Sequence, residues 1–570
     1  MKINTYYPFY KATVFENFRV MADQVAEQYP DRTAYSFRRK PADEEIVRIS
    51  FTTARDDIRD LATGFLARDI VGRHVALIGE ATYEWILCFY SLLAANAVLI
   101  PIDRDLPATD IRDILERSGS DYVIYSPTVA TKVGEALDGA SVRPVRISLG
   151  DTARESETLL RAIKEDGHTR FLGGDTVYSD RDIDIKTLAM IVFTSGTTGK
   201  GKGVMLSQEN ICLDMTNGMY LFDITPKTIN FLPPHHTFGS TVNFVGHFSQ
   251  GSEVYLSSGL RYIASEIREQ QPTHLVLVPL FLEKLCSRIW SKAEETGKDK
   301  TLRRMIRISN LLRKVGIDLR RKIFKSVLEP FGGRLEMVIC GGAALKQDII
   351  DTFDGIGITI MNGYGITECA PLVACNRNKK QKAGSVGLPI LHEEVKILAP
   401  DENGEGEICV KGPNVMLGYY QDEEATAAAF TEDGFFRTGD YGKIDEEGWL
   451  YITGRLKNLI ILSNGKNVYP EEIETSLSQI RGVLEVIVYA GESRSQKEKE
   501  VIVAEIFPDK ELLESDGVTD IAAYFDREVK RINRLNPSYK TVNLVKIRTE
   551  EFSKNTSKKI TRFNLDKSID

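Results

Sequence analysis

A loop rich in glycine and small hydroxyl residues lies near the middle of the chain. It reads Phe-Thr-Ser-Gly-Thr-Thr-Gly-Lys-Gly-Lys-Gly-Val over residues 193–204 and follows an apolar run at 188–192. Glycines let backbone N–H groups converge on oxygen, hydroxyls add donors and lysines supply charge, so such a loop can wrap a polyphosphate. The alternative that this stretch alone leaves open is a glycine-rich surface turn.

The loop is not the P-loop of mononucleotide switches and motors. Gly196, Gly201 and Lys202 have the spacing of that motif, but a P-loop needs Ser or Thr at the next position to bind Mg²⁺. Gly203 occupies that position. The sequence therefore disfavours a switch or motor protein.

The loop instead resembles the phosphate loop of the adenylate-forming (AMP-binding, ANL) superfamily, which includes acyl-CoA synthetases, peptide-synthetase adenylation domains and firefly luciferase. The usual form is Thr-Ser-Gly-Thr-Thr-Gly-x-Pro-Lys-Gly-Val, and the chain departs from it only at Gly201, where proline is usual. Five further motifs resemble the superfamily's in the right order: an adenine segment, an adenine and Mg²⁺ motif, a ribose motif, a hinge and a catalytic-lysine motif. They lie at 341–345, 362–368, 436–440, 454–457 and 558–562.

The resemblance implies a reaction of a carboxylate with ATP that gives an acyl-adenylate and pyrophosphate, followed by transfer of the acyl group to CoA. ATP, Mg²⁺ and CoA as a substrate are the implied cofactors. The nucleotide-binding residues that it implies are Thr194, Ser195, Gly196, Thr197, Thr198, Gly199, Gly342, Ala343, Ala344, Asn362, Tyr364, Gly365, Asp440 and Arg455. The implied catalytic residues are Lys202, Thr367, Glu368 and Lys559.

Four further roles come from the same resemblance. Glu368 and Thr197 are the expected Mg²⁺ ligands, His236 the gate of the acyl pocket, and Gly465 a contact of CoA. Lys457 matches the hinge about which the C-terminal domain of the superfamily rotates. The hinge region departs from the usual pattern at Asn458, where aspartate is common, and at Asn464, where glycine is common.

The residue types suit this chemistry. A carboxylate that attacks an α-phosphate brings anions together, so the site must supply positive charge and hydrogen-bond donors. Mg²⁺ takes one or two carboxylates together with substrate phosphates. Each of three residues, taken singly, also has a purely structural explanation. Asp440 could be a turn residue, Tyr364 a core residue and Glu368 a solvated carboxylate.

The catalytic lysine is identified by its neighbours. Three residues within 553–558 differ from the usual motif, and two adjacent lysines blur its register. Ile560 and Arg562 restore the register and select Lys559, with Lys558 as the fallback. The structural alternative is a solvated basic tail, which is typical of lysine-rich segments.

Composition limits the class of protein. At 570 residues the chain is too long for a single core. A net charge of −8 argues against broad nucleic-acid binding, so small-molecule substrates are the expected partners. Seven scattered cysteines without a Cys-x-x-Cys motif indicate a reducing cytoplasm without disulfides or zinc, and the seven histidines show no metal-ligand pattern.

No membrane-spanning or leader segment is expected. The start of the chain lacks an apolar leader core. The most apolar stretch, 85–101, is shorter than a bilayer requires and contains Ser91, Asn96 and Pro101. It is better explained as a core helix over 83–95 followed by a strand over 97–102.

The expected fold class is α/β, because apolar strand runs alternate with helical patterns. Strands are expected at 75–78, 122–125, 275–278 and 337–340. The predicted domains are 1–456, with two parallel α/β subdomains and a β-rich subdomain at about 390–456, and 457–570, a small mobile α+β domain. The β-rich subdomain is inferred from short apolar runs divided by Asp/Glu/Asn-Gly turns.

The acid substrate is narrowed by two features. Relatives that activate amino acids carry an aspartate where this chain has Gly239, so a buried ammonium group would lack a countercharge. No carrier domain with its Asp-Ser-Leu attachment site is expected after the C-terminal unit either, which disfavours a peptide-synthetase module. Residues 283–334 resemble the helical insertion of long-chain fatty acyl-CoA synthetases, and 298–314 within it are basic and amphipathic. They predict contact with an acyl-chain entrance or an anionic membrane surface, or else a solvated helix face.

The resulting hypothesis is a cytoplasmic fatty acid–CoA ligase for medium or long chains, with peripheral membrane contact as a further expectation. Three alternatives stay open. They are a ligase for aryl or other carboxylic acids, an enzyme that passes its adenylate to an acyl carrier protein, and a catalytically lapsed nucleotide-binding relative. The oligomeric state and the chain length of the acid are not predicted.

Overall fold

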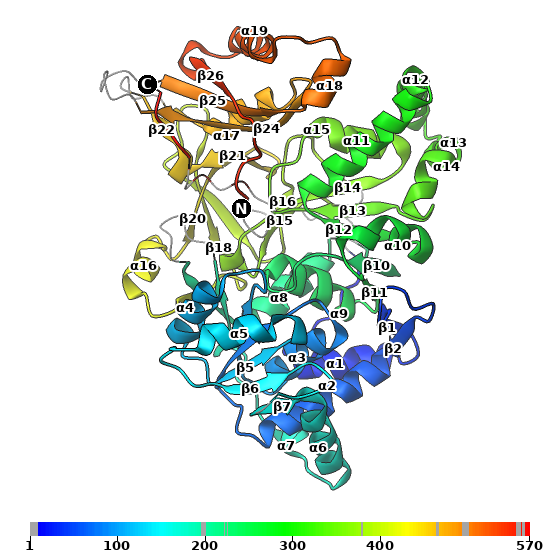
Figure 1. Ribbon diagram of the computed structural model, residues 1–570, viewed down its shortest axis with the longest axis vertical. Coiled ribbons are helices and arrows are strands. Elements are labelled where there is room, and N and C mark those ends of the chain that lie inside the picture. The colour runs from blue at the N-terminus through cyan, green and yellow to red at the C-terminus, as the bar shows by residue number, and fades with distance from the viewer. Residues whose placement is uncertain are drawn as a thin grey trace. The chain divides into compact units, whose positions relative to one another are not determined.

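The computed structural model describes residues 10–154, 156–194, 201–221, 223–224, 226–377, 380–462, 467–492, 501–554, 560, 562 and 565–569 (Figure 1). The chain divides into two compact units. The first comprises Met1–Glu394 and Lys411–Gly434, and the second comprises Val395–Val410 and Phe435–Asp570. Most of the β-rich region is thus grouped with the C-terminal part of the chain, while the domain boundary expected at Lys457 stays a prediction.

The first unit contains an eight-stranded sheet in the order β19-β9-β8-β4-β3-β5-β6-β7. Its strands are β3 (His74–Ile78), β4 (Val98–Ile102), β5 (Tyr122–Tyr125), β6 (Val145–Ser148), β7 (Glu157–Leu159), β8 (Leu188–Phe193), β9 (Gly203–Ser207) and β19 (Gly418–Tyr419). The strands from β8 to β7 are parallel, whereas β9 and β19 are antiparallel to their neighbours. The central strands are continuous apolar runs, as expected for parallel strands buried on both faces.

Two further sheets complete this unit. The four-stranded sheet β10-β11-β1-β2 consists of β1 (Thr33–Phe37), β2 (Val47–Ser50), β10 (Lys227–Asn230) and β11 (Glu253–Leu256). The five-stranded sheet consists of β12 (His274–Leu277), β13 (Met337–Cys340), β14 (Thr359–Gly365), β15 (Leu372–Cys375) and β16 (Leu388–Pro389), in that order. Strands β12, β13 and β14 are parallel, and β15 and β16 continue the sheet antiparallel.

Helices cover these sheets. They are α1 (Phe18–Gln28), α2 (Phe51–Leu66), α3 (Tyr83–Ala94), α4 (Ala108–Ser118), α5 (Ala130–Leu137), α6 (Leu160–Leu172), α7 (Val177–Asp180), α8 (Gln208–Met219), α9 (His247–Ser249), α10 (Ile263–Gln270), α11 (Pro279–Glu295), α12 (Asp299–Lys314), α13 (Arg320–Ile323), α14 (Lys325–Leu328), α15 (Gln347–Ile356) and α16 (Glu423–Ala428). Figure 1 shows α11, α12 and α15 together beside the five-stranded sheet. Their apolar faces share one core cluster with β12, β13 and β14.

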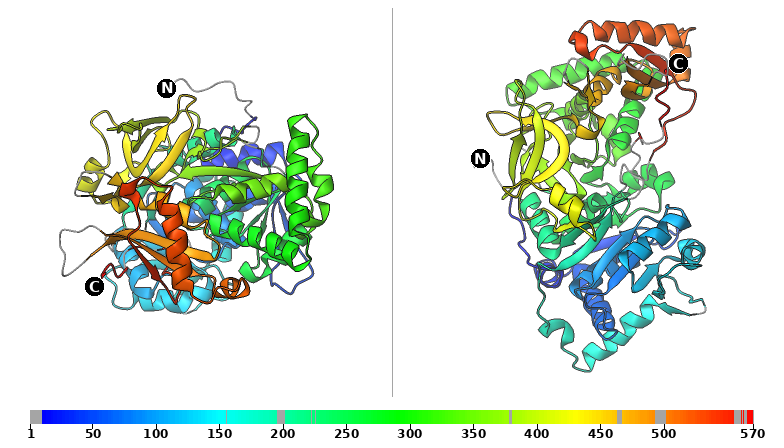
Figure 2. Two further views of the ribbon diagram at one scale, coloured as in Figure 1. Left: turned by 90° about the horizontal axis from the view of Figure 1, so that it is seen from above. Right: turned by 90° about the vertical axis from the view of Figure 1, so that its left-hand side faces the viewer.

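The second unit holds the sheet β17-β18-β20-β21, which is strongly curved in the right-hand view of Figure 2. Its strands are β17 (Glu394–Leu398), β18 (Gly406–Lys411), β20 (Phe436–Ile444) and β21 (Leu450–Arg455). The remaining elements are β22 (Ile460–Ile461), β23 (Asn467–Val468), α17 (Pro470–Leu477), β24 (Val483–Gly491), β25 (Val501–Pro508), α18 (Lys510–Ser515), α19 (Ile521–Asn533) and β26 (Leu544–Ile547). The strands β24, β25 and β26 form a sheet whose core includes residues of α17 and α19.

The expected elements are confirmed where the sequence pattern was strongest. The four apolar runs form β3, β5, β12 and β13, and the apolar stretch at 83–102 forms helix α3 and strand β4. The Asp-Glu-Glu-Gly turn at 445–448 separates the antiparallel strands β20 and β21, and the Glu-Asp-Gly turn at 432–434 precedes β20, which pairs antiparallel with β18. Over the part of the chain that the structure describes, no helix combines the length and apolar character needed to cross a bilayer.

The packing of α2 against α6 generates a stability prediction. A Cβ atom at Gly167 of α6 would lie 1.8 Å from the carbonyl oxygen of Asp60 in α2, so even alanine forces the helices apart. Gly167→Ala is expected to lower the free energy of unfolding by roughly 2 to 3 kcal/mol. Gly134→Ala in α5 is the matched control, because nothing lies within 4 Å of its added methyl. Thermal unfolding of both variants checks this, and equal midpoints would contradict the close approach.

Candidate active site

Strands β8 and β9 flank the glycine-rich loop in the sequence and form an antiparallel pair, here called the phosphate hairpin. Phe193 lies opposite Gly203 in this pair. Between them, the N–H of Thr194 donates to the carbonyl of Lys202 at 2.9 Å. The predicted phosphate-binding residues Ser195, Gly196, Thr197, Thr198 and Gly199 lie outside the described residues.

The position that departs from the superfamily's loop has a structural explanation. A Cβ atom at Gly201 would lie 1.9 Å from the carbonyl oxygen of Thr194. Proline and every other residue with a side chain is therefore excluded from this backbone conformation. Glycine lets the two arms of the hairpin approach each other at the base of the loop.

Three side chains meet beside this hairpin. The Nζ atom of Lys202 lies 4.3 Å from the centroid of the Tyr419 ring. The hydroxyl of Tyr419 donates to Oε1 of Glu368 at 3.0 Å. Burial raises the pKa of Tyr419, and the Glu368 carboxylate raises it further, so the phenol remains a hydrogen-bond donor at neutral pH. The structure thus brings together two predicted catalytic residues through Tyr419, which the sequence analysis did not identify.

Segment 414–420 holds this cluster in place through backbone pairing. Tyr419 lies opposite Val204 in the pairing of β19 with β9. The N–H of Met416 donates to the carbonyl of Glu368 at 2.8 Å. The side-chain amide of Asn414 donates to the carbonyl of Cys369 at 3.0 Å. One segment therefore fixes both the hairpin and the loop that carries Glu368.

The predicted adenine residues lie at the carboxyl edge of the five-stranded sheet. Strands β13 and β14 run parallel, with Cys340 opposite Asn362. Gly342, Ala343 and Ala344 follow β13 and are exposed, and Gly342 has a φ of +89°. Tyr364 near the end of β14 is 7% exposed. Ligands bind in open α/β sheets at this edge, so the placement suits a flat base.

Strand β14 leads directly to Glu368. A Cβ atom at Gly365 would lie 2.3 Å from the carbonyl oxygen of Pro371, so the tight return of the chain requires glycine there. A short 3₁₀ helix, η5 (Thr367–Cys369), follows. Thr367 and Glu368 are both half-buried on it.

The predicted acyl gate, His236, precedes a π-helix, η2 (Phe238–Gly246). Its carbonyl accepts hydrogen bonds from the backbone N–H groups of Gly239 and Ser240 at 2.9 and 2.8 Å. A Cβ atom at Gly239 would lie 2.1 Å from the carbonyl oxygen of Pro233. The aspartate found here in relatives that activate amino acids is therefore excluded by space as well as absent from the sequence.

His235 beside the gate is buried and its Nε2 lies 3.4 Å from Oδ2 of Asp103. Burial lowers its pKa to about 4, and the nearby Arg104 cation contributes to the shift. The imidazole is therefore neutral at physiological pH. Its ring centroid lies 4.1 Å from that of His236, so the two rings constrain each other.

The second unit contains the predicted ribose residues. Asp440 on β20 lies opposite Arg455 on β21. Nε of Arg455 lies 2.7 Å from Oδ1 of Asp440, whose side chain is almost fully buried. The backbone N–H of Asp440 donates to Oγ1 of Thr438 at 3.0 Å. Antiparallel pairing thus places both predicted residues side by side.

The predicted hinge lies on a 3₁₀ turn, η6 (Leu456–Asn458), where Lys457 is exposed. The side-chain amide of Asn458 donates to Oε1 of Glu471 at 2.5 Å. The usual aspartate at this position would place two carboxylates in contact. Asn458 is therefore matched to Glu471. The predicted CoA contact, Gly465, lies outside the described residues.

Lys559 also lies outside the described residues, but its flanks are anchored in the second unit. Ile560 packs against a core cluster that includes Tyr489 and Phe552. Arg562 donates to both oxygens of Glu474 at 2.5 and 2.7 Å. The isoleucine and the arginine of the lysine motif are thus both anchored to the second unit.

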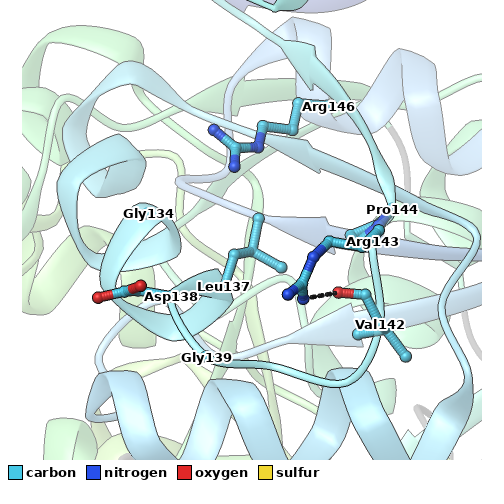
Figure 3. A pocket seen from close by; sticks show the side chains of 8 residues that line it. All are labelled: Gly134, Leu137, Asp138, Gly139, Val142, Arg143, Pro144 and Arg146. Carbon is cyan, nitrogen blue, oxygen red and sulfur yellow. Dashed lines mark hydrogen bonds between the residues drawn. The ribbon is translucent and has the colours of Figure 1, made fainter.

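A surface pocket of the first unit is lined by none of these predicted residues. It has a volume of about 380 Å³ at the C-terminal end of α5. Figure 3 shows its lining residues: Gly134, Leu137, Asp138, Gly139, Val142, Arg143, Pro144 and Arg146. Arg143 donates to the carbonyl of Val142 at 2.9 Å, so part of its donor capacity is used within the wall.

The protein thus has a mixed α/β fold in which a glycine-rich segment suited to phosphate lies near the half-buried Glu368. The sequence profile of the AMP-binding enzyme family matches residues 22–420, and the chain belongs to that family. This confirms the resemblance that the motifs indicated.

Individual relatives agree with this assignment. The chain is 30% identical over 488 residues to the long-chain-fatty-acid–CoA ligase FadD15 of Mycobacterium bovis, which covers 82% of this chain and 79% of the relative. It is 26% identical over 562 residues to the chloroplastic long-chain-fatty-acid–[acyl-carrier-protein] ligase AEE15 of Arabidopsis thaliana, covering 85% and 75% respectively.

A solved structure confirms the fold class. The crystal structure of ATP-bound MatB from Rhodopseudomonas palustris matches with a TM-score of 0.75 at 23% identity, covering 96% of this chain and 97% of MatB.

The buried histidines predict a pH dependence of stability. Burial lowers the pKa of His235 and of His247 to about 4, and it lowers that of His274 well below its usual value. The unfolded chain therefore binds more protons between pH 6.5 and 4, so stability falls as the pH falls through this window. Each histidine contributes a slope of up to about 1.4 kcal/mol per pH unit.

Thermal unfolding of the His235→Gln variant between pH 7 and 5 tests this dependence. The variant is expected to show a shallower fall than the wild type. His392→Asn is the matched control, because His392 is exposed at a φ of +63° that asparagine tolerates. An unchanged slope in the His235 variant would show that this imidazole does not oppose protonation.

Proposed function

We propose that this protein activates a medium- or long-chain fatty acid with ATP and transfers the acyl group to CoA, releasing AMP and pyrophosphate. The observation that carries the proposal is the cluster of Lys202, Tyr419 and Glu368. In this cluster Tyr419 lies between the Lys202 cation of the phosphate hairpin and the Glu368 carboxylate, which follows strand β14. The family assignment and the relatives that act on long-chain fatty acids support the same reaction.

In this proposal the phosphate hairpin binds the β- and γ-phosphates of ATP. Thr194 and the hydroxyls of the loop donate hydrogen bonds, and Lys202 supplies positive charge. Thr367 donates to the α-phosphate. Tyr364 and the backbone of 342–344 bind adenine at the edge of the sheet.

Mg²⁺ is proposed to bind Glu368 together with the substrate phosphates and Thr197. Tyr419 occupies Oε1 of Glu368 as a donor, and the carboxylate keeps its second oxygen for the ion. No group of three or more His, Cys, Asp or Glu side chains suited to a metal occurs among the described residues. One carboxylate with substrate phosphates is the arrangement that Mg²⁺ commonly takes, and the ion supplies charge neutralisation of the phosphates.

The second unit contributes the ribose and catalytic residues of the proposal. Asp440 accepts from the ribose hydroxyls, and Arg455, already paired with it, provides a second contact. Lys559 bridges the attacking carboxylate and the α-phosphate. The anchoring of Ile560 and Arg562 supports this register of the motif. Rotation about Lys457, between domains 1–456 and 457–570, is proposed to exchange the adenylation and CoA-transfer steps, with Gly465 approaching CoA.

The proposed acid and acyl acceptor are each supported by one observation. His236 gates the acyl pocket. Because Gly239 has no space for a side chain, the aspartate that would bind an α-ammonium group cannot be accommodated there. The relative that acylates a carrier protein favours a second candidate, in which the adenylate passes to an acyl carrier protein. A cytoplasmic location with peripheral membrane contact belongs to the same proposal.

Pyrophosphate release tests the proposed function. Purified protein with Mg-ATP is given acids from acetate to oleate, benzoate and amino acids, each with and without CoA. Fatty acids are expected to stimulate release, with sustained turnover only when CoA is present. Lys559→Ala is the control expected to lose adenylation while it still thiolyses supplied acyl-adenylate.

The other outcomes of this assay are equally informative. Release that CoA does not increase, but a carrier protein does, would replace CoA by that acceptor. A preference for benzoate would indicate that the enzyme activates aryl acids instead of fatty acids. Binding of ATP without release for any acid would indicate a lapsed enzyme and contradict the proposal.

Tyr419→Phe tests the positioning role of the Tyr419 hydroxyl. The change keeps the ring near Lys202 and removes the hydrogen bond to Glu368, and a hydrogen bond to a charged group is worth roughly 1.5 to 3 kcal/mol. The Mg²⁺ concentration for half-maximal pyrophosphate release is expected to rise roughly tenfold or more. Tyr420→Phe is the matched control, because its hydroxyl accepts from Gln421 instead. Equal Mg²⁺ dependence in both variants would sink this role.

A further inference from the structure

Exposed aliphatic side chains are concentrated at one place in the first unit. Five of them lie within twelve residues at the end of α12 and in the turn that follows, with exposed fractions from 36% to 72%. They are Ile308, Leu311, Val315, Ile317 and Leu319. Single exposed aliphatic residues are normal on a protein surface, but a contiguous group indicates a binding surface.

The aliphatic side chains at the end of helix α12 lie on the face opposite its core contacts. Leu302 and Ser309 are buried, and Ile306 packs so closely on α15 that a Cβ atom at Gly355 would lie 2.7 Å from it. Residues three, four and seven apart share one face of a helix. Ile308, Leu311 and Val315 follow this spacing on the exposed side.

Basic residues share that exposed face. Arg304, Arg307 and Lys314 are all exposed and alternate with the aliphatic residues along the helix. Residues 298–325 contain eleven Lys and Arg against two Asp, in a chain whose net charge is −8. The local excess of nine positive charges is therefore opposite in sign to the whole molecule.

The end of α12 is held in a defined conformation. The N–H of Ile317 donates to the carbonyl of Leu312 at 3.0 Å, and Gly316 has a φ of +83°. This is the bonding pattern of a Schellman motif, which terminates helices. Arg313 and Arg320 both donate to Asp354 on α15, at 2.5 and 3.0 Å. The aliphatic group is thus presented by a fixed turn.

We propose that residues 304–319, here called the α12 tip, dock on the surface of an anionic lipid bilayer. The aliphatic side chains would enter the boundary between headgroups and acyl chains, while the basic side chains bind lipid phosphates. A bilayer suits this surface, because aliphatic side chains flanked by Lys and Arg are typical of helices that lie in an anionic lipid interface.

This inference rests on the proposed function, because it specifies the surface that makes the proposed peripheral membrane contact. Docking is therefore measured in the absence of ATP, acid and CoA, so that failure of vesicle binding and failure of ligase activity are separate results. Full-length protein is sedimented with vesicles of phosphatidylcholine alone or mixed with phosphatidylglycerol. Binding is expected only to the anionic vesicles and is expected to weaken as salt is raised.

Two sets of variants locate the contact. Leu311→Ser with Val315→Ser removes apolar contact, and Arg304→Gln with Arg307→Gln and Lys314→Gln removes charge. Each set is expected to weaken binding to anionic vesicles roughly tenfold or more. Leu172→Ser with Leu535→Ser is the matched control, since these residues are similarly exposed, at 71% and 76%. Wild-type affinity in both tip variants would overturn the proposal.

Insertion is measured directly by a fluorophore. All seven native cysteines are buried, so Val315→Cys offers a selective site for an environment-sensitive label. A blue shift on addition of anionic vesicles is expected, and none for a label at Leu172→Cys. Binding of the wild type without a shift at position 315 would contradict docking through the α12 tip. So would self-association that the Leu311 and Val315 variant abolishes while vesicle binding persists.

Discussion

The hydrogen bond from Tyr419 to Glu368 is the constraint on which the candidate site depends. Its donor comes from a strand that pairs with the phosphate hairpin, and its acceptor comes from the helical turn after the adenine strand. The Tyr419 ring also faces the ammonium group of Lys202. One side chain therefore sets the separation between a cation and a carboxylate that must both serve the same polyphosphate, and it does so without neutralising either.

Close backbone approach fixes the loops around this bond. At Gly201, Gly239 and Gly365 a carbonyl oxygen lies within 2.3 Å of the place where a Cβ atom would be. The three glycines belong to the phosphate hairpin, the gate region and the return to Glu368. Since these contacts are made by backbone atoms, they cannot relax through a change of rotamer, and larger residues would require the loops themselves to move. The departure from proline at Gly201 is thus a consequence of local geometry.

The sequence was sufficient for the features that local patterns determine. Apolar runs predicted β3, β5, β12 and β13, the most apolar stretch of the chain predicted α3, and the amphipathic spacing of 298–314 predicted α12, because burial shapes these patterns directly. Tyr419 was missed because its role arises from the register of β19 on β9, a pairing between distant segments. The match between Asn458 and Glu471 was hidden for the same reason. The sheet of β17, β18, β20 and β21 belongs to the same compact unit as the C-terminal part, and this association also depends on long-range packing.

The charge distribution favours approach of an anionic bilayer through the α12 tip. Apart from residues 298–325, the chain carries a net charge of −17, which an anionic bilayer repels. The Debye length is about 8 Å at physiological ionic strength, so only charges close to the lipid surface act on it. The excess of positive charge in residues 298–325, which include the α12 tip, therefore determines local attraction, while the acidic remainder opposes approach by other faces. Because Arg313 and Arg320 tie the tip to α15, a bilayer that binds it also fixes the orientation of the five-stranded sheet, whose carboxyl edge carries the predicted adenine residues.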